Sequence, residues 1–90
     1  MIIVCYDISD NSLRTSFSKM LTRHGAIRVQ YSVYEANNTK RWIDTLKGIV
    51  EREYSKLFEP TDSVIIFETD SHKELKYGKE IYRDKEIVFL

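Results

Sequence analysis

An unbroken apolar run opens the chain and ends in two carboxylates. Residues 2–6 are β-branched, apolar or aromatic, which is typical of a strand buried on both faces. Asp7 follows this run directly, and Asp10 lies three residues later. A buried strand has no structural need for a carboxylate at its end, so Asp7 lies where a core element meets a surface loop, a common place for chemistry. The alternative is that Asp7 or Asp10 only caps the next helix, and the residues alone leave both open.

Two later stretches have the 3.6-residue periodicity of amphipathic helices. The first covers residues 12–24, and Gly25 then supplies a C-terminal cap. The second covers residues 40–57 and begins after a turn. Gly48 lies inside the second helix, where we expect a neighbour to pack closely.

Three basic residues lie near the N-termini of these two helices. Arg14 lies near the N-terminus of the first helix and close to Asp7 in sequence, and Lys40 and Arg41 occupy the first turn of the second. The helix dipole makes a cation at a helix N-terminus unfavourable by about a few tenths of a kcal/mol, a cost that an exposed position tolerates. Cations are also expected where a helix N-terminus meets an anion such as phosphate. Both interpretations remain open from the residues alone.

The stretch at residues 27–35 alternates apolar and polar side chains with a period of two, which indicates strand structure. The run is either one bent strand or two short strands joined by almost no turn. Its polar face would carry Arg28, Gln30 and Tyr34. Such groups can bind a phosphate backbone, and they also suit an ordinary solvated sheet face.

Two further strands complete the predicted pattern. Residues 63–68 are apolar enough for a central strand, and residues 86–90 form a short apolar strand that needs a partner edge in this chain or in a second subunit. The order is β-α-β-α-β with a terminal β extension. This order predicts a single α/β domain over residues 1–90, an α+β sandwich of the ferredoxin-like kind. Two helices would cover one face of a mainly antiparallel sheet, and the core would span about residues 1–68.

The same arrangement predicts a homodimer. A domain of 90 residues is near the lower limit for a self-sufficient core. Two helices on one face leave the other sheet face open, and such a face often becomes a dimer interface. We expect residues 69–90 to contribute to that interface.

Composition narrows the chemistry. The chain has 14 basic and 14 acidic residues, which is not the charge of a strongly basic nucleic-acid-binding domain. The balance is uneven, since residues 1–50 carry seven basic residues against four acidic ones. One cysteine, no membrane-length apolar run and no signal peptide lead us to expect a cytoplasmic protein. There is no glycine-rich phosphate loop, zinc-type Cys/His spacing or serine-hydrolase elbow.

What remains is Asp7, with Asp10 as a second candidate, as a hard oxygen ligand for Mg²⁺. One carboxylate makes a weak metal site. Two copies of Asp7 related by a dimer axis would do better, with one ion per dimer, because a bridged divalent ion can activate water and clamp a phosphodiester.

Two motifs in the right order resemble the CRISPR-associated Cas-two family. They are Tyr6-Asp7-Ile8-Ser9-Asp10 at the end of the first strand and the run from Arg28 to Glu35, which reads Arg-Val-Gln-Tyr-Ser-Val-Tyr-Glu. Chain length also fits, and the likeness is strongest over residues 1–36. Some members carry a further arginine at the position of Ser16.

The resemblance implies a ferredoxin-like homodimer that acts in CRISPR spacer acquisition. In such proteins the dimer lies along duplex DNA between two dimers of the partner integrase, the Cas-one family. Metal-dependent cleavage of single-stranded RNA or of DNA is also ascribed to members, so a stand-alone endonuclease is the alternative function. By resemblance, Asp7 with its symmetry mate and Tyr6 would be catalytic, and Asp7 would hold Mg²⁺. The nucleic-acid-binding candidates, from resemblance and from the residue patterns together, are Arg14, Arg28, Gln30, Tyr34, Lys40 and Arg41.

Overall fold

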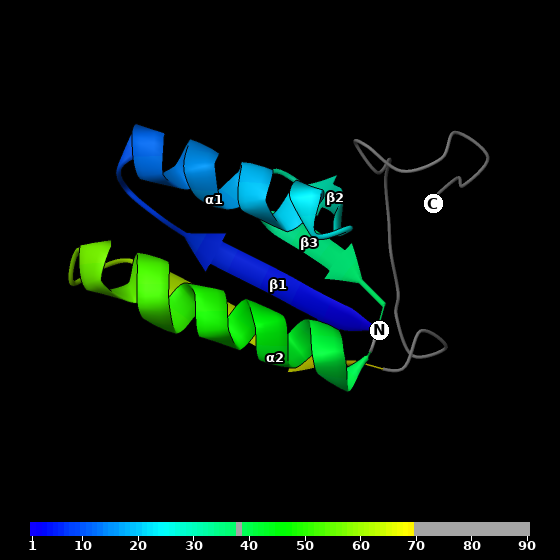
Figure 1. Cartoon of the computed structure of the whole chain (residues 1–90). Helices are drawn as coiled ribbons and strands as arrows, with labels where there is room; N and C mark the ends of the chain where they lie inside the picture. The colour runs from blue at the N-terminus through cyan, green and yellow to red at the C-terminus, as the bar shows by residue number, and fades with distance from the viewer. Residues whose placement is uncertain (38, 70–90) are drawn as a thin grey trace.

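The computed structural model describes residues 1–37 and 39–69 (Figure 1). The predicted strand at 86–90 and the predicted dimer contacts of residues 69–90 therefore lie outside the described residues, except for Thr69. The described elements follow in the order β1 (Ile2–Asp7), α1 (Asn11–Arg23), β2 (Ile27–Gln30), β3 (Val33–Ala36), α2 (Lys40–Ile49), the π-helical turn η1 (Val50–Tyr54), the 3-10 turn η2 (Ser55–Leu57) and β4 (Ser63–Glu68).

The four strands form one antiparallel sheet in the order β2-β3-β1-β4. Figure 1 shows α1 and α2 lying side by side over the same face of this sheet. The predicted ferredoxin-like architecture is confirmed: two helices cover one face of an antiparallel sheet. The stretch at 27–35 is two strands, β2 and β3, joined at Tyr31 and Ser32.

The core lies between β1 and the two helices. Alternate residues of β1 point toward the helices, and Ile2, Val4 and Tyr6 are buried there. The ring of Phe17 from α1 packs edge-on against Tyr6, with a centroid distance of 5.0 Å. It also packs edge-on against Tyr54 of η1, again at 5.0 Å. One aromatic side chain thus joins β1, α1 and η1, and it is fully buried.

Helix ends follow the capping chemistry of the sequence. Asp10 caps α1, since its Oδ2 accepts a hydrogen bond of 2.8 Å from the backbone N–H of Leu13. Thr39 caps α2 in the same way, through the backbone N–H of Trp42. Gly25 follows α1 with a positive φ of 89°, a conformation that favours glycine.

The second helix differs from the single helix predicted over residues 40–57. It is α-helical to Ile49 and then widens into η1 before tightening into η2. The widened turn brings the Tyr54 hydroxyl to 2.9 Å from the Ser16 hydroxyl of α1. The close packing expected at Gly48 is only the guanidinium end of Arg52, 2.6 Å from where a Cβ would lie.

The prediction of a central strand at residues 63–68 is wrong for the described sheet, in which β4 is an edge and β1 is central. The apolar run suggested a central strand because both faces of this edge strand carry apolar side chains. Val64 and Ile66 pack on the core, while Ile65 and Phe67 are 57% and 47% exposed on the other face. Cross-strand pairing sets Phe67 opposite Ile3 and Ile65 opposite Cys5.

Candidate functional site

Asp7 is the last residue of β1, and its side chain is exposed. It pairs with Ser63 at the matching end of β4. Because side chains alternate along a strand, Asp7 lies on the helix-free face of the sheet with Ile3 and Cys5, whereas Tyr6 faces the helices. The structure therefore resolves the open choice between the two carboxylates: Asp10 caps α1, and no capping bond to Asp7 is found in the described chain.

The loop after Asp7 is held from both sides. From α1, Arg14 donates through Nη1 to the Ile8 carbonyl at 3.0 Å, and its Nη2 bonds the Asn11 side chain. From the turn before β4, Asp62 accepts bonds from the Ser9 backbone N–H at 3.0 Å and from the Ser9 hydroxyl at 2.9 Å. The predicted anion-binding cation Arg14 is thus bonded to the loop that follows Asp7.

Asp62 should make stability depend on pH. Bonds from the backbone N–H of Glu59 and then of Ser9 lower the pKa of its carboxyl. A lowered folded-state pKa means that the stabilisation is complete above the ordinary aspartate range, about pH 4, and is lost as pH falls through the folded value.

We therefore expect Asp62→Ala to lower the melting temperature at pH 7 and to lower it less at pH 3. Thermal melts followed by circular dichroism measure the two differences, with Asp44→Ala, an exposed aspartate on α2, as the control. An equal loss at both pH values would contradict this role for the Asp62 carboxylate.

Tyr6, predicted as catalytic beside Asp7, is instead in the core. It is 5% exposed, and burial raises the pKa of its phenol. Its hydroxyl lies beside those of Ser18 and Tyr34, which bond each other, but it makes no hydrogen bond of good geometry itself. Strand alternation explains why the structure does not bring Tyr6 and Asp7 together.

Tyr34 also departs from its predicted place on a polar sheet face, since it is 1% exposed. Tyr34 pairs with Val4 of β1, so its side chain lies on the face that the helices cover. The register between β2 and β3 shifts between Arg28 and Gln30, which breaks the predicted alternation at Gln30. Arg28 pairs with Tyr34, with its guanidinium carbon 5.8 Å from the Tyr34 ring centroid. Gln30 remains exposed at the end of β2.

The two helices carry further basic residues besides those predicted from the sequence to bind nucleic acid. Helix α1 contains Arg14, Lys19 and Arg23 and no acidic residue, and α2 contains three basic residues and one acidic residue. Lys40 and Arg41 are exposed in the first turn of α2, as predicted.

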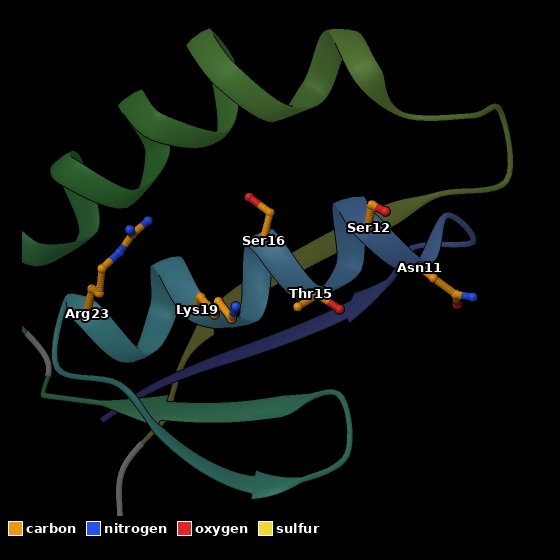
Figure 2. A pocket seen from close by; sticks show the side chains of 6 residues that line it. All are labelled: Asn11, Ser12, Thr15, Ser16, Lys19 and Arg23. Carbon is orange, nitrogen blue, oxygen red and sulfur yellow. The ribbon is translucent and has the colours of Figure 1, made fainter.

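A polar hollow of about 480 Å³ lies along α1. Figure 2 shows Ser12, Ser16 and Arg23 reaching from α1 toward α2. Lys19 also lines the hollow. Lys19 and Arg23 were not among the residues predicted from the sequence to bind nucleic acid. The signal was present, since positions 12, 16, 19 and 23 form one helical stripe of hydroxyls and cations.

Among residues 1–37 and 39–69, no three His, Cys, Asp or Glu side chains gather in a way that could hold a metal ion. Asp10 accepts the capping hydrogen bond of helix α1, and Asp62 accepts a hydrogen bond from the Ser9 hydroxyl. At this end of β1 the described part of one chain therefore supplies Asp7 alone, which fits Mg²⁺ only as half of a site shared between two copies. Within the same residues, neither helix is long and apolar enough to cross a membrane.

Comparison with known proteins places this architecture in a family. The family model described as "CRISPR associated protein Cas2" matches residues 1–77. The chain belongs to the Cas2 family. Among Cas2 relatives, "CRISPR-associated endoribonuclease Cas2 1" of Methanospirillum hungatei is 33% identical over 67 residues, covering 74% of this chain and 67% of the relative. A protein named "CRISPR-associated endoribonuclease Cas2" from Haloferax volcanii is 34% identical over 70 residues, covering 78% of this chain and 74% of the relative.

A crystal structure supports the fold independently. A hypothetical protein from Thermus thermophilus superposes with a TM-score of 0.71 at 24% sequence identity, covering 91% of this chain and 95% of the other. The resemblance seen in the two sequence motifs is thereby confirmed at the level of family and fold.

Proposed function

We propose that this Cas2-family protein acts in CRISPR spacer acquisition as a homodimer that binds duplex DNA and bridges dimers of the Cas-one integrase. The observation that carries the proposal is the helix layer, where exposed cations outnumber acids on both α1 and α2. A duplex presents one phosphate charge per about 1.7 Å, so a continuous cationic surface binds it without reading its sequence. A bridging scaffold needs that kind of contact.

The second half of the proposal is the dimer. The helix-free face of the sheet is apolar at its centre, with Ile3 and Cys5 on β1 flanked by Ile65 and Phe67 on β4. Ile65 and Phe67 on β4 are exposed, and exposed apolar side chains that lie together are expected where another surface covers them. Asp7 lies at the end of this same face. A two-fold axis through the face would set each Asp7 toward its twin.

A second candidate function is an endonuclease, and one specific observation favours it. Asp7 is an exposed carboxylate with no structural role in the described chain, and the relatives named above are called endoribonucleases. The Asp7 carboxylates of two copies would hold one Mg²⁺, and the bound ion would supply a water of lowered pKa and charge stabilisation at a phosphodiester. The substrate would be single-stranded RNA or double-stranded DNA. Arg14 and Asp62 would keep the loop behind Asp7 in place.

The salt dependence of DNA binding tests the first proposal. We expect the wild-type affinity for a duplex to fall steeply with salt, and the double variant Lys19→Gln/Arg23→Gln to bind more weakly with a log–log slope smaller by about 2. Fluorescence anisotropy with a labelled duplex at several salt concentrations measures both.

The matched control is Arg52→Gln/Lys56→Gln, which removes the same charges at the same spacing, but from a stretch that also holds Glu51 and Glu53. We expect little change in its slope. Equal slopes for both double variants would count against α1 as the DNA-binding surface.

A further inference from the structure

A second hollow lies on the other flank of α1, against the edge strand β2. Its volume is about 370 Å³, within the range of about 300–1,000 Å³ typical of small-ligand sites. It is distinct from the hollow of Figure 2, with which it shares no lining residue. Its lining combines three hydroxyls, one cation and two apolar side chains: Ser18, Thr22, Tyr34, Arg28, Ala26 and Ile27.

The cation of this hollow is held in a fixed place. Arg28 donates through Nε and Nη2 to the carbonyl of Tyr31, at 3.1 and 2.9 Å. Its guanidinium carbon lies 5.1 Å from the Tyr31 ring centroid and 5.8 Å from that of Tyr34. A guanidinium stacked between two rings needs no further ordering when a ligand arrives, so binding costs less entropy.

Beside the hollow stands an exposed aromatic ring. Tyr31 is 66% exposed, more than any other large hydrophobic side chain of the described residues. It occupies the turn between β2 and β3, and its backbone carbonyl is fixed by Arg28. The ring thus offers a flat apolar surface next to a positive charge.

One buried hydroxyl lies behind the residues that line the hollow. The Tyr6 hydroxyl is fully enclosed and lacks a hydrogen bond of good geometry, yet it lies beside Ser18 and Tyr34, which line the hollow. A buried hydroxyl without a well-formed hydrogen bond costs free energy. Binding is therefore favoured for a ligand that lets the neighbouring hydroxyls rearrange and give this group a partner.

We propose that the α1–β2 hollow binds one unpaired nucleotide of a single-stranded nucleic acid, with the adjacent base stacked on Tyr31. The chemistry matches part by part: Arg28 attracts the phosphate, and the exposed side chain of Ile27 contacts the base. The hydroxyl oxygens of Ser18 and Thr22, which already bond Tyr34 and the Ser18 carbonyl, accept hydrogen bonds from the sugar. A paired base is stacked inside its duplex and cannot enter such a hollow, so the site selects single strands. A second copy of this chain suits the surface less well, since the hollow is polar and lies beside the helix layer.

This inference rests on the proposed binding of nucleic acid and adds a strand-selective site to it. The test uses short single-stranded RNA and DNA oligonucleotides containing 2-aminopurine, whose fluorescence falls when the base stacks. Mg²⁺ is left out so that no cleavage occurs. We expect quenching with wild type, and at least a fivefold weaker affinity with loss of quenching for Tyr31→Ala. Tyr31→Phe keeps the ring and should bind as wild type.

A second variant fills the hollow without touching the core. Thr22 is exposed on α1, so Thr22→Trp should block the hollow and weaken single-strand binding at least fivefold, leaving duplex binding unchanged. Thr45→Trp, at an exposed position of α2, is the matched control and should bind both normally. A preference for RNA over DNA of the same sequence would assign the Ser18 and Thr22 hydroxyls to the ribose 2′-hydroxyl, and equal affinities would assign them to the sugar–phosphate backbone shared by both.

The outcomes separate this inference from the function on which it rests. Normal single-strand binding and quenching by both Tyr31→Ala and Thr22→Trp overturn the hollow as a nucleotide site, even if the duplex binds with the expected salt dependence. A change in dimerisation alone on Tyr31→Ala overturns it too, in favour of a subunit contact. Failure of wild type to bind any oligonucleotide or duplex overturns the proposed function itself.

Discussion

Asp7→Asn should reduce Mg²⁺-dependent cleavage of single-stranded RNA by about 10²-fold or more, the usual scale for losing a group that acts on the reacting proton or metal. The amide keeps the size of the side chain and removes its charge. Because Asp7 is exposed at a strand end, we expect the melting temperature to stay within about a degree of wild type. Cleavage of a labelled oligonucleotide with and without EDTA measures the effect.

The chain offers a matched control three residues away. Asp10→Asn makes the same chemical change at the residue that caps α1. Asparagine caps a helix about as well as aspartate, so neither stability nor cleavage should change. Cleavage by Asp7→Asn at the wild-type rate would eliminate Asp7 as a catalytic residue and with it the endonuclease proposal.

The same variant separates the two functions. If the protein is primarily a scaffold, Asp7→Asn should still bind duplex DNA and still support integration by the partner integrase. Loss of integration with intact DNA binding would show that the scaffold-first proposal is wrong. Mixed dimers carrying one Asp7→Asn subunit test whether the site is shared: a two-copy site should lose nearly all cleavage rather than half.

Ile65→Lys should convert the proposed homodimer into a monomer. Ile65 is exposed on the helix-free face opposite Cys5, within the surface we assign to the second copy. Burying an isoleucine contributes about 1.5–3 kcal/mol, and a two-fold interface contains the residue twice. The dissociation constant should therefore rise by about 10²-fold or more. Sedimentation velocity over a concentration series measures it.

Leu57→Lys is the control for that substitution. Leu57 is equally exposed, at 59% against 57%, but belongs to η2 rather than to the sheet. It should leave the dimer unchanged. Since neither side chain is part of the buried core, both variants should fold, which circular dichroism can verify. An Ile65→Lys protein that dimerises with wild-type affinity would remove the sheet face as the interface and leave each Asp7 without its twin.

Local chemistry in the sequence was enough for most of the elements. The period of two, the period of 3.6 and the capping residues located β1, α1, the start of α2 and β4, because each depends on neighbours within a turn or two. The order of the elements then limited the fold to a two-helix layer on an antiparallel sheet. The run from Tyr6 to Asp10 and the run from Arg28 to Glu35 identified the family.

The positions of the candidate side chains were less predictable, because they depend on contacts between distant elements. Tyr34 looked polar and exposed, but it lies opposite Val4 on the face of the sheet that the helices cover. Tyr6 and Asp7 are adjacent in sequence and face opposite sides of β1. Residues 63–68 looked central because an apolar run does not say whether its second face meets a helix, another subunit or solvent.

By itself, the sequence determined most of the elements, the family, and Asp7 and Asp10 as the two unusual carboxylates, since each follows from short-range patterns. Only the tertiary structure decided that Asp10 is the cap, that Tyr6 and Tyr34 are core residues, and that α1 carries separate hollows on its two flanks. Those outcomes depend on which strand lies beside which and on the register between them. That information is set by packing across the whole domain and is not carried by any one stretch of chain.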